Sequence, residues 1–246
     1  MKIIQKLTLG LLTVVAFSTS TSAANLIMDV EGTDVATNSG VLTGTGQKIG
    51  AGTLIMSGAN GTSLTNLEID AGLIQYAASG NVGSQVTFAG GNLQTTAAAD
   101  IPALVMNADA TVTAGGAGAL AGLSGSNKLT IAGTGIVTPA DLSGAGAAVD
   151  ISGKVNFGAS SASKLPAADI NVLSGGLAKV MAATANCAPD DMIVQSGGVL
   201  EVATSVNVPA DTGADLFGTL KFNSGATLKL GNLARWERAI TVGTAL

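Results

Sequence analysis

Eight short segments of this 246-residue chain repeat one pattern: apolar and polar residues alternate, the chain bends at a small residue, and the alternation resumes. The segments are residues 67–76, 86–95, 104–113, 129–138, 149–157, 170–180, 192–202 and 220–230. Because successive side chains of a strand point to opposite faces, each segment predicts two short strands joined by a bend. The bends are centred on Gly72, Gly90, Ala108, Gly133, Gly153, Gly175, Gly197 and Gly225. Such repetition is typical of a solenoid, in which each turn stacks on the previous one.

The alternation also predicts which side chains fill the interior. The expected inner pairs are Leu67/Ile69, Val86/Phe88, Leu104/Met106, Leu129/Ile131, Val149/Ile151, Ile170/Val172, Met192/Val194 and Leu220/Phe222. The intervening outer residues are Glu68, Thr87, Val105, Thr130, Asp150, Asn171, Ile193 and Lys221, and they share no chemistry. We therefore expect one inward stripe and a surface without a demanding partner at each turn. A hairpin-built sandwich or barrel is the rival architecture, since it also has short strands at regular spacing.

The clearest internal match joins residues 172–176 and 194–198, two neighbouring bends that share valine, serine and two glycines in the same order. If the chain completes one turn between successive bends, four serines lie at one corner of the coil. These are Ser152, Ser174, Ser196 and Ser224. Their hydroxyls can then bond backbone groups of adjacent turns, although turn composition alone also explains serine at these places.

Composition agrees with a thin and regular core. Only 3% of the residues are aromatic and 11% are charged, while 34 are glycine and none is histidine. A catalytic triad with histidine is therefore excluded. The single Cys187 permits no disulfide within the chain and has no basic neighbour that would make it a thiolate.

The N-terminus predicts export. Lys2 and Lys6 precede an apolar run at residues 7–17, and Thr21-Ser22-Ala23 fits a cleavage site for a secretory signal peptide. We assign residues 1–23 to this leader, the only segment with a helical pattern, and residues 24–246 to one solenoid domain. Without the two leader lysines, acidic side chains outnumber basic ones further than in the whole chain, where 16 acidic residues face 11 basic ones. This balance disfavours nucleic acid as a partner.

Residues 52–75, GTLIMSGANGTSLTNLEIDAGLIQ, carry a family resemblance. They resemble the autotransporter-associated β-strand repeat of bacterial surface proteins, in which a G-T-L-x-L-S-G-A-N opening precedes an N/D-A-G-x-L turn. The opening matches residues 52–54 and 57–60, and the turn matches Asp70, Ala71 and Gly72. The resemblance implies an all-β fold, a single right-handed parallel β-helix (solenoid), as the passenger of an autotransporter. The family's outer-membrane barrel needs more aromatic residues than this chain has, so we expect either a truncated passenger, which meets a membrane only through a missing C-terminal barrel, or an end that a partner covers.

Several reactive-looking motifs lack their companions. Residues 211–215, DTGAD, resemble an aspartic-protease loop, and residues 161–164, SASK, have the S-x-x-K spacing of penicillin-binding enzymes, but neither has its supporting motif. Asp190-Asp191 and the pair Asp211/Asp215 allow at most weak calcium binding. We therefore expect no catalytic residue, no cofactor and no dedicated metal site.

The residues 235–238, Arg-Trp-Glu-Arg, form the densest polar and aromatic cluster. Arg235, Trp236 and Arg238 are the candidate partner contact, because tryptophan and arginine anchor many interfaces. The alternative is that Trp236 fills the last turn. Residues 240–246 read as a further strand, whose uncapped edge favours end-to-end self-association.

Together these patterns predict a secreted, non-catalytic surface protein that acts as a stalk or adhesin. Its implied partner is a protein or glycan on a host or neighbouring cell. Two alternatives remain: a self-assembling surface-layer or filament subunit, and a β-helical carbohydrate-active enzyme.

Overall fold

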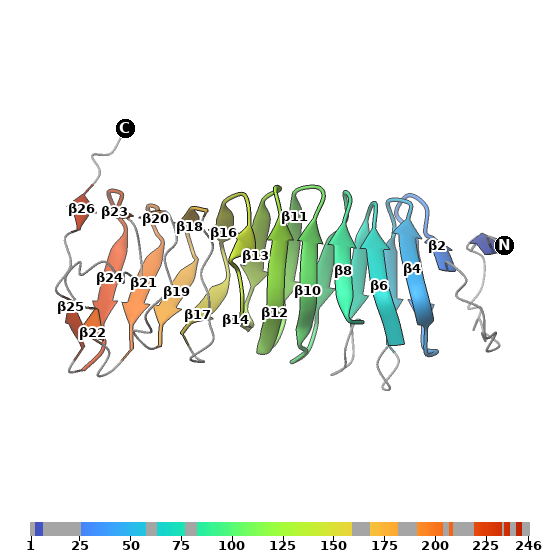
Figure 1. The fold of residues 1–246 in the computed structure, drawn as a ribbon, viewed down its shortest axis with the longest axis horizontal. Helices are drawn as coiled ribbons and strands as arrows, with labels where there is room; N and C mark the ends of the chain where they lie inside the picture. The colour runs from blue at the N-terminus through green and yellow to red at the C-terminus, as the bar shows by residue number, and fades with distance from the viewer. Residues whose placement is uncertain are drawn as a thin grey trace.

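The structure is a computed structural model, and it describes residues 3–6, 26–57, 63–76, 83–158, 168–181, 191–203, 207–208, 219–232, 234–236 and 240–242. Every regular element in these ranges is a β-strand. The strands succeed one another along an elongated rod, from blue β2 near one end to red β26 near the other (Figure 1). The predicted all-β solenoid is confirmed, while its right-handed winding stays a prediction.

Two long sheets run along the rod. Sheet A has 13 strands in the order β1-β2-β4-β6-β8-β10-β12-β14-β17-β19-β21-β24, with β15 beside β12. Their bounds are β1 Ile3–Lys6, β2 Leu26–Asp29, β4 Thr43–Ile49, β6 Ser63–Ile69, β8 Gln85–Phe88, β10 Ile101–Met106, β12 Gly118–Gly125, β14 Ile136–Pro139, β15 Gly144–Ala145, β17 Lys154–Phe157, β19 Leu177–Val180, β21 Val199–Val202 and β24 Thr227–Leu230.

Sheet B has 11 strands in the order β26-β23-β20-β18-β16-β13-β11-β9-β7-β5-β3. Their bounds are β3 Val35–Asn38, β5 Thr53–Met56, β7 Leu73–Tyr76, β9 Asn92–Thr95, β11 Ala110–Ala114, β13 Leu129–Gly133, β16 Val149–Ile151, β18 Ile170–Val172, β20 Asp191–Val194, β23 Thr219–Phe222 and β26 Thr241–Val242. A third, two-stranded sheet joins β22 (Asn207–Val208) to β25 (Arg235–Trp236).

Neighbouring strands are parallel wherever two described strands pair, for example β6 with β8 and β18 with β20. A hairpin-built sandwich or barrel would pair successive strands antiparallel, so that alternative is wrong. Instead the chain alternates between sheet A and sheet B. One strand from each sheet forms one turn of the solenoid, which we call a rung.

The predicted inner residues are all buried; the most exposed of them is Phe222, at 7%. The expectation of one common stripe was nevertheless wrong. Leu67, Val86 and Leu104 stack in register in sheet A, whereas Leu129 and Val149 stack in sheet B. Each rung therefore contributes two inward stripes that face each other, one from each sheet.

The bends between strands explain this difference. From β4 to β13, each sheet A strand reaches the following sheet B strand through a short bend, at 50–52, 70–72, 89–91, 107–109 and 126–128. From β13 to β24, the short bends instead lead from sheet B to sheet A, at 134–135, 152–153, 173–176, 195–198 and 223–226. The repeat recognised in the sequence follows the short bend. It therefore changes from one edge of the rod to the other between Ala108 and Gly133.

At the corner that joins sheet B to sheet A in the second half, the predicted hydroxyl bond to an adjacent turn is present at Ser152. The Ser152 hydroxyl donates to the Ile131 carbonyl of the preceding rung at 3.4 Å. At the following corners the backbone makes the link, since the N–H of Gly175 donates to the Gly197 carbonyl at 3.0 Å and the N–H of Gly197 donates to the Gly225 carbonyl at 3.0 Å.

The leader segment differs from its helical expectation where it is described. Residues 3–6 form β1, which pairs in parallel with β2. The rest of residues 1–23 lies outside the described chain.

Candidate functional site

A lysine lies inside the first half of the rod. Lys48 of β4 stands in register with Ile69 of β6, and Ile69 with Phe88 of β8, so it occupies an inward position that later rungs fill with apolar side chains. Its side chain is fully buried, at 0% exposure. A buried ammonium must be hydrogen-bonded, because leaving it without partners costs several kcal/mol.

Three backbone carbonyls in or beside two bends accept hydrogen bonds from this ammonium. Lys48 Nζ donates to the Ile49 carbonyl at 3.1 Å, to the Ala71 carbonyl at 3.0 Å, and to the Gly50 carbonyl. Ile49 and Gly50 lie at the start of one bend, and Ala71 belongs to the bend of the next rung. The lysine therefore ties two successive bends together from inside the rod.

The second of these bends has room only for glycine. Gly72 has φ of +68°, and a Cβ built there would lie 2.6 Å from Lys48 Nζ and closer still to the Gly52 carbonyl oxygen. This is the glycine of the Asp-Ala-Gly turn in the family resemblance. The glycine of this turn is thus required by its positive φ and by the Gly52 carbonyl of the preceding rung, with Lys48 Nζ close beside it.

Acidic and amide side chains lie on the strands and bends next to the lysine. Gln47 Nε2 donates to Asp70 Oδ2 at 2.7 Å. One buried carboxylate oxygen of Asp29, Oδ1, and the corresponding oxygen of Asp70 have no hydrogen-bond partner. Glu68 lies on the outer face, in register with Gln47. We call these five residues, Asp29, Gln47, Lys48, Glu68 and Asp70, the lysine cluster.

Burial shifts two pKa values in the lysine cluster. Burial lowers the pKa of Lys48, and the negative charge of Asp29 opposes this shift. The pKa of Glu68 is raised by burial, then by the charge of Asp70 and by a hydrogen bond that a protonated Glu68 can donate to Asp70. No group of three or more potential metal-ligating side chains occurs among the described residues.

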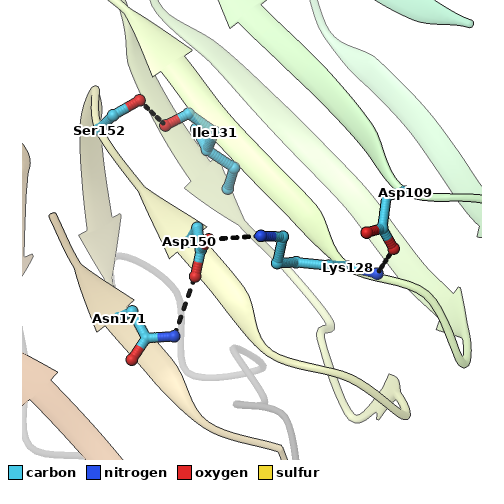
Figure 2. A network of polar contacts seen from close by, with 6 residues as sticks. All are labelled: Asp109, Lys128, Ile131, Asp150, Ser152 and Asn171. Carbon is cyan, nitrogen blue, oxygen red and sulfur yellow. Dashed lines mark hydrogen bonds and ion pairs between the residues drawn. The ribbon is translucent and has the colours of Figure 1, made fainter.

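A second polar network crosses the outer face of sheet B in the middle of the rod (Figure 2). Asp150 of β16 accepts from Lys128 Nζ at 3.1 Å and from Asn171 Nδ2 at 2.9 Å. The backbone N–H of Lys128 donates to Asp109 Oδ1 at 2.8 Å. The hydrogen bond and charge of Asp150 raise the pKa of Lys128. Four successive rungs are therefore joined by one chain of polar contacts.

The contact from Asp109 to Lys128 recurs along the rod. Asn92 Oδ1 accepts from the N–H of Thr111 at 2.8 Å, and Asp100 Oδ1 accepts from the N–H of Ala119 at 3.0 Å. All three contacts have the same separation along the chain. Sequence reasoning missed them, although Asn or Asp spaced one rung ahead of a strand start is a usable signal. It also missed Lys48, which alignment of residues 46–51 with residues 67–72 would have placed at an apolar inner position.

Outer positions are therefore coupled to one another more than the sequence suggested. Besides the contact of Asp150 with Asn171, Thr87 Oγ1 donates to Asn66 Oδ1 at 3.1 Å. Lys179 Nζ and Glu201 Oε1 of adjacent rungs form an ion pair at 2.7 Å. The expectation of an unconstrained outer surface is wrong at these rungs.

The predicted partner contact is only partly within the described chain. Arg235 and Trp236 form β25, which pairs with β22 and belongs to neither long sheet. Nothing further is described of their side chains, and Arg238 lies outside the described residues. Their contact with a partner stays a prediction.

Of the other candidate site residues named in the sequence analysis, most also lie outside the described chain. Cys187, Asp190, residues 161–164 and residues 211–215 lie outside the described residues. Asp191 is described, and its Oδ1 accepts from the N–H of Thr219 in the next rung at 3.1 Å. Its carboxylate therefore links rungs, as Asp109 does.

The fold and these polar contacts define a class: a parallel β-solenoid whose polar side chains join successive rungs. No protein-family model matches the chain, and neither a curated protein nor a solved structure shows significant similarity to it. In the part of the chain that the structure describes, no helix has the length and apolar character needed to span a membrane.

Proposed function

We propose that this chain is an exported, non-catalytic bacterial surface protein, a rigid stalk or adhesin of the autotransporter passenger type. The observation that carries the proposal is the use of its polar side chains. Lys48, Asp109, Asp150 and the pair of Lys179 with Glu201 connect one rung to the next. Such contacts stiffen a rod, because each rung touches only its neighbours and the rod is as rigid as these interfaces.

The sequence supports the finer parts of the proposal. The leader pattern at residues 1–23 supports export, and the matched residues of the Gly52–Gln75 segment support the passenger type and right-handed winding. The long connections between strands supply display sites, since function in such folds resides in the loops that a rigid scaffold positions.

Processing and surface exposure test the proposal. We would express the full chain in a bacterium with an outer membrane, determine the N-terminus by mass spectrometry, and treat intact cells with protease. The expected result is an N-terminus at Ala24 and digestion on intact cells. Ala23→Arg is the control that blocks cleavage, because the processing enzyme requires a small residue there. An uncleaved chain inside the cell would contradict the proposal.

Adhesion is tested separately with the purified chain. We expect it to bind to host cells or to a glycan panel in a saturable way, and to lose that binding when its surface loops are removed by limited proteolysis. Absence of saturable binding would remove the adhesin role and leave the stalk.

The carbohydrate-active alternative has one observation in its favour, the closeness of Glu68 and Asp70 with a raised pKa at Glu68. Glycosidases use such carboxylate pairs as acid and base. The nearby cation does not complete a catalytic site, because Lys48 is buried and its ammonium binds three carbonyls. Polysaccharide hydrolysis by the wild type that Glu68→Gln abolishes would establish the enzyme; we expect no hydrolysis by either protein.

A further inference from the structure

The C-terminal rung presents its interior to the surface. In sheet A, Val202 is fully buried, while Leu230, its register partner in β24, is 50% exposed. In sheet B, Phe222 is 7% exposed and its partner Val242 in β26 is 76% exposed. The described residues place no strand beyond β24 and β26. Among the described residues, one edge of each sheet at this end therefore has no further strand beside it.

At the opposite end, the leader already supplies such a strand. β1 lies beside β2 at the N-terminal end of the rod (Figure 1). The register places Gln5 beside Met28 and Lys6 beside Asp29. Removal of residues 1–23 takes this strand away and leaves the edge of β2 unpaired.

The sequence of β24 fits the position that β1 occupies. With Leu228 beside Met28, Lys229 stands beside Asp29, where the leader places Lys6. The same register puts Leu230 beside Val30, which is 3% exposed. The alternation also agrees, because Leu228 and Met28 both pack against the core of the rod. A lysine beside an acid on adjacent parallel strands occurs within the chain at Lys179 and Glu201.

The two ends also carry opposite charge. Residues 26–38 contain Asp29, Glu31 and Asp34 and no basic residue. Residues 219–232 contain Lys221 and Lys229 and no acidic residue. Charges of opposite sign at the two ends favour contact between different ends and oppose contact between like ends.

We propose that the C-terminal end of one copy docks on the N-terminal end of a second copy, with β24 on β2 and β26 on β3, and that leader strand β1 blocks this contact until export removes it. The contact is heterologous, so it repeats into an open filament rather than closing into a dimer. It rests on the proposed function for leader removal and concerns residues 24–246 alone, and a chain prepared without residues 1–23 tests it independently of export.

Sedimentation of two chains, residues 1–246 and residues 24–246, tests the proposal over a concentration range of about a hundredfold. We expect the longer chain to remain monomeric and the shorter chain to grow beyond a dimer. A shorter chain that shows the circular dichroism of folded β-structure and stays monomeric would overturn the proposal. So would growth that stops at two copies.

Full-length Ile4→Pro provides a second route if the shorter chain does not fold. Proline removes the backbone donor of β1 at that position and weakens its pairing with β2, while every rung from β2 onward keeps its sequence. We expect this variant to associate where the wild-type full chain does not. A folded variant that remains monomeric would contradict the blocking role of β1.

Charge reversal tests the register. In the chain that associates, Lys229→Glu should weaken association about three- to tenfold, because it replaces an attraction with a repulsion beside Asp29. Lys221→Glu is the control for an added negative charge: it is also exposed, one strand earlier in sheet B, and its register neighbours are Ile193 and Thr241, whereas Lys229 also stands beside Glu201 of its own chain. Equal weakening by both substitutions would overturn the β24-on-β2 register.

Discussion

The two halves of the rod have the same kind of apolar interior, but their short bends lie at opposite edges. From β4 to β13 the chain passes from sheet A to sheet B through short, even bends and returns less uniformly, for example by the connections 57–62 and 77–84. From β17 to β20 it passes from sheet A to sheet B by the long connections 158–169 and 181–190, and returns by the short bend 173–176. The comparison shows that the fold does not fix at which edge of the rod the short bends lie. In each half, the connections at one edge of the rod are short and similar, while the connections at the other edge vary in length.

The halves also differ in how their rungs are tied. The first half has a cation inside the rod, since Lys48 binds carbonyls of two bends. Both halves have polar contacts between rungs on the outer faces, as in the contact of Thr87 with Asn66 in the first half and of Asp150 with Asn171 in the second. A buried polar tie has more effect on stability than an exposed one, because its partners have no water to replace it.

The largest expected effect tests whether the interiors are equivalent. Leu67→Ala in the first half and Leu200→Ala in the second each remove a fully buried leucine from sheet A. Each should lower the free energy of unfolding by about 2–5 kcal/mol, from lost burial and a new cavity. Urea denaturation measures both. If the two losses of unfolding free energy differed by more than the width of that range, the claim that both halves share one kind of interior would be wrong.

The next largest effect compares a short bend at one edge of the rod with a long connection at the other. Inserting a short Gly/Ser segment into bend 89–91 should cost about 2–3 kcal/mol, because it disrupts bonds such as the Gly91 N–H to the Ile69 carbonyl at 3.1 Å and the Ala89 N–H to the same carbonyl at 2.9 Å. The same segment inserted between β17 and β18 should cost less than about 0.6 kcal/mol, since a long connection lengthens at little entropic cost. Thermal unfolding compares the two. Equal costs would show that the edges do not differ.

The buried lysine should give an effect of about 1–3 kcal/mol. Lys48→Met keeps the side-chain volume and leaves the carbonyls of Gly50 and Ala71 without the ammonium, so it should destabilise the rod by that amount near neutral pH. Urea denaturation at neutral pH measures the loss of unfolding free energy. Gln47→Met, on the outer face of the same strand, instead removes the hydrogen bond to Asp70, so comparison of the two variants separates the inner contacts from the outer one.

The pH dependence of Lys48→Met has a definite sign. Burial lowers the pKa of Lys48 below its ordinary value of 10.5 in the folded chain. Between the two values the unfolded chain holds more protons, so wild-type stability should rise with pH toward 10.5. The variant should lack this rise. Parallel stability profiles for the two proteins would mean that the lysine titrates alike in both states.

The smallest expected effect concerns the outer ties. Lys179→Met removes the ion pair with Glu201 and should change stability by less than about 1 kcal/mol, because the pair is partly exposed. The effect should fall further as salt is added, since salt screens exposed charges. A loss as large as that of Lys48→Met would mean that the outer ties are as strong as the inner one.

The local parts of the fold could be predicted from the sequence. Alternation within each short segment predicted that Leu67, Leu129 and Met192 face inward, and all three are buried. The corner at Ser152 was predicted from glycine and serine at a bend, and its bond to Ile131 is present. Both predictions succeed because the direction of a side chain in a strand, and the shape of a bend, depend on a few consecutive residues.

The lysine cluster could not be predicted in the same way. The short bends of the two halves have similar sequences, so nothing local shows at which edge of the rod a bend lies. The contact of Lys48 with Ala71 joins two rungs that are distant along the chain. Which residue stands above which depends on the length of every intervening connection.

The sequence by itself therefore determined an all-β chain of short strands with a buried aliphatic stripe. Only the tertiary structure decided that each rung has two stripes, that Lys48 binds the Ala71 carbonyl of the next rung, and that Asp150 meets Lys128 and Asn171. The physical reason is that strand direction and bending are fixed by neighbours along the chain. Contacts between rungs are fixed by register, which follows from the backbone hydrogen bonds of the stacked turns.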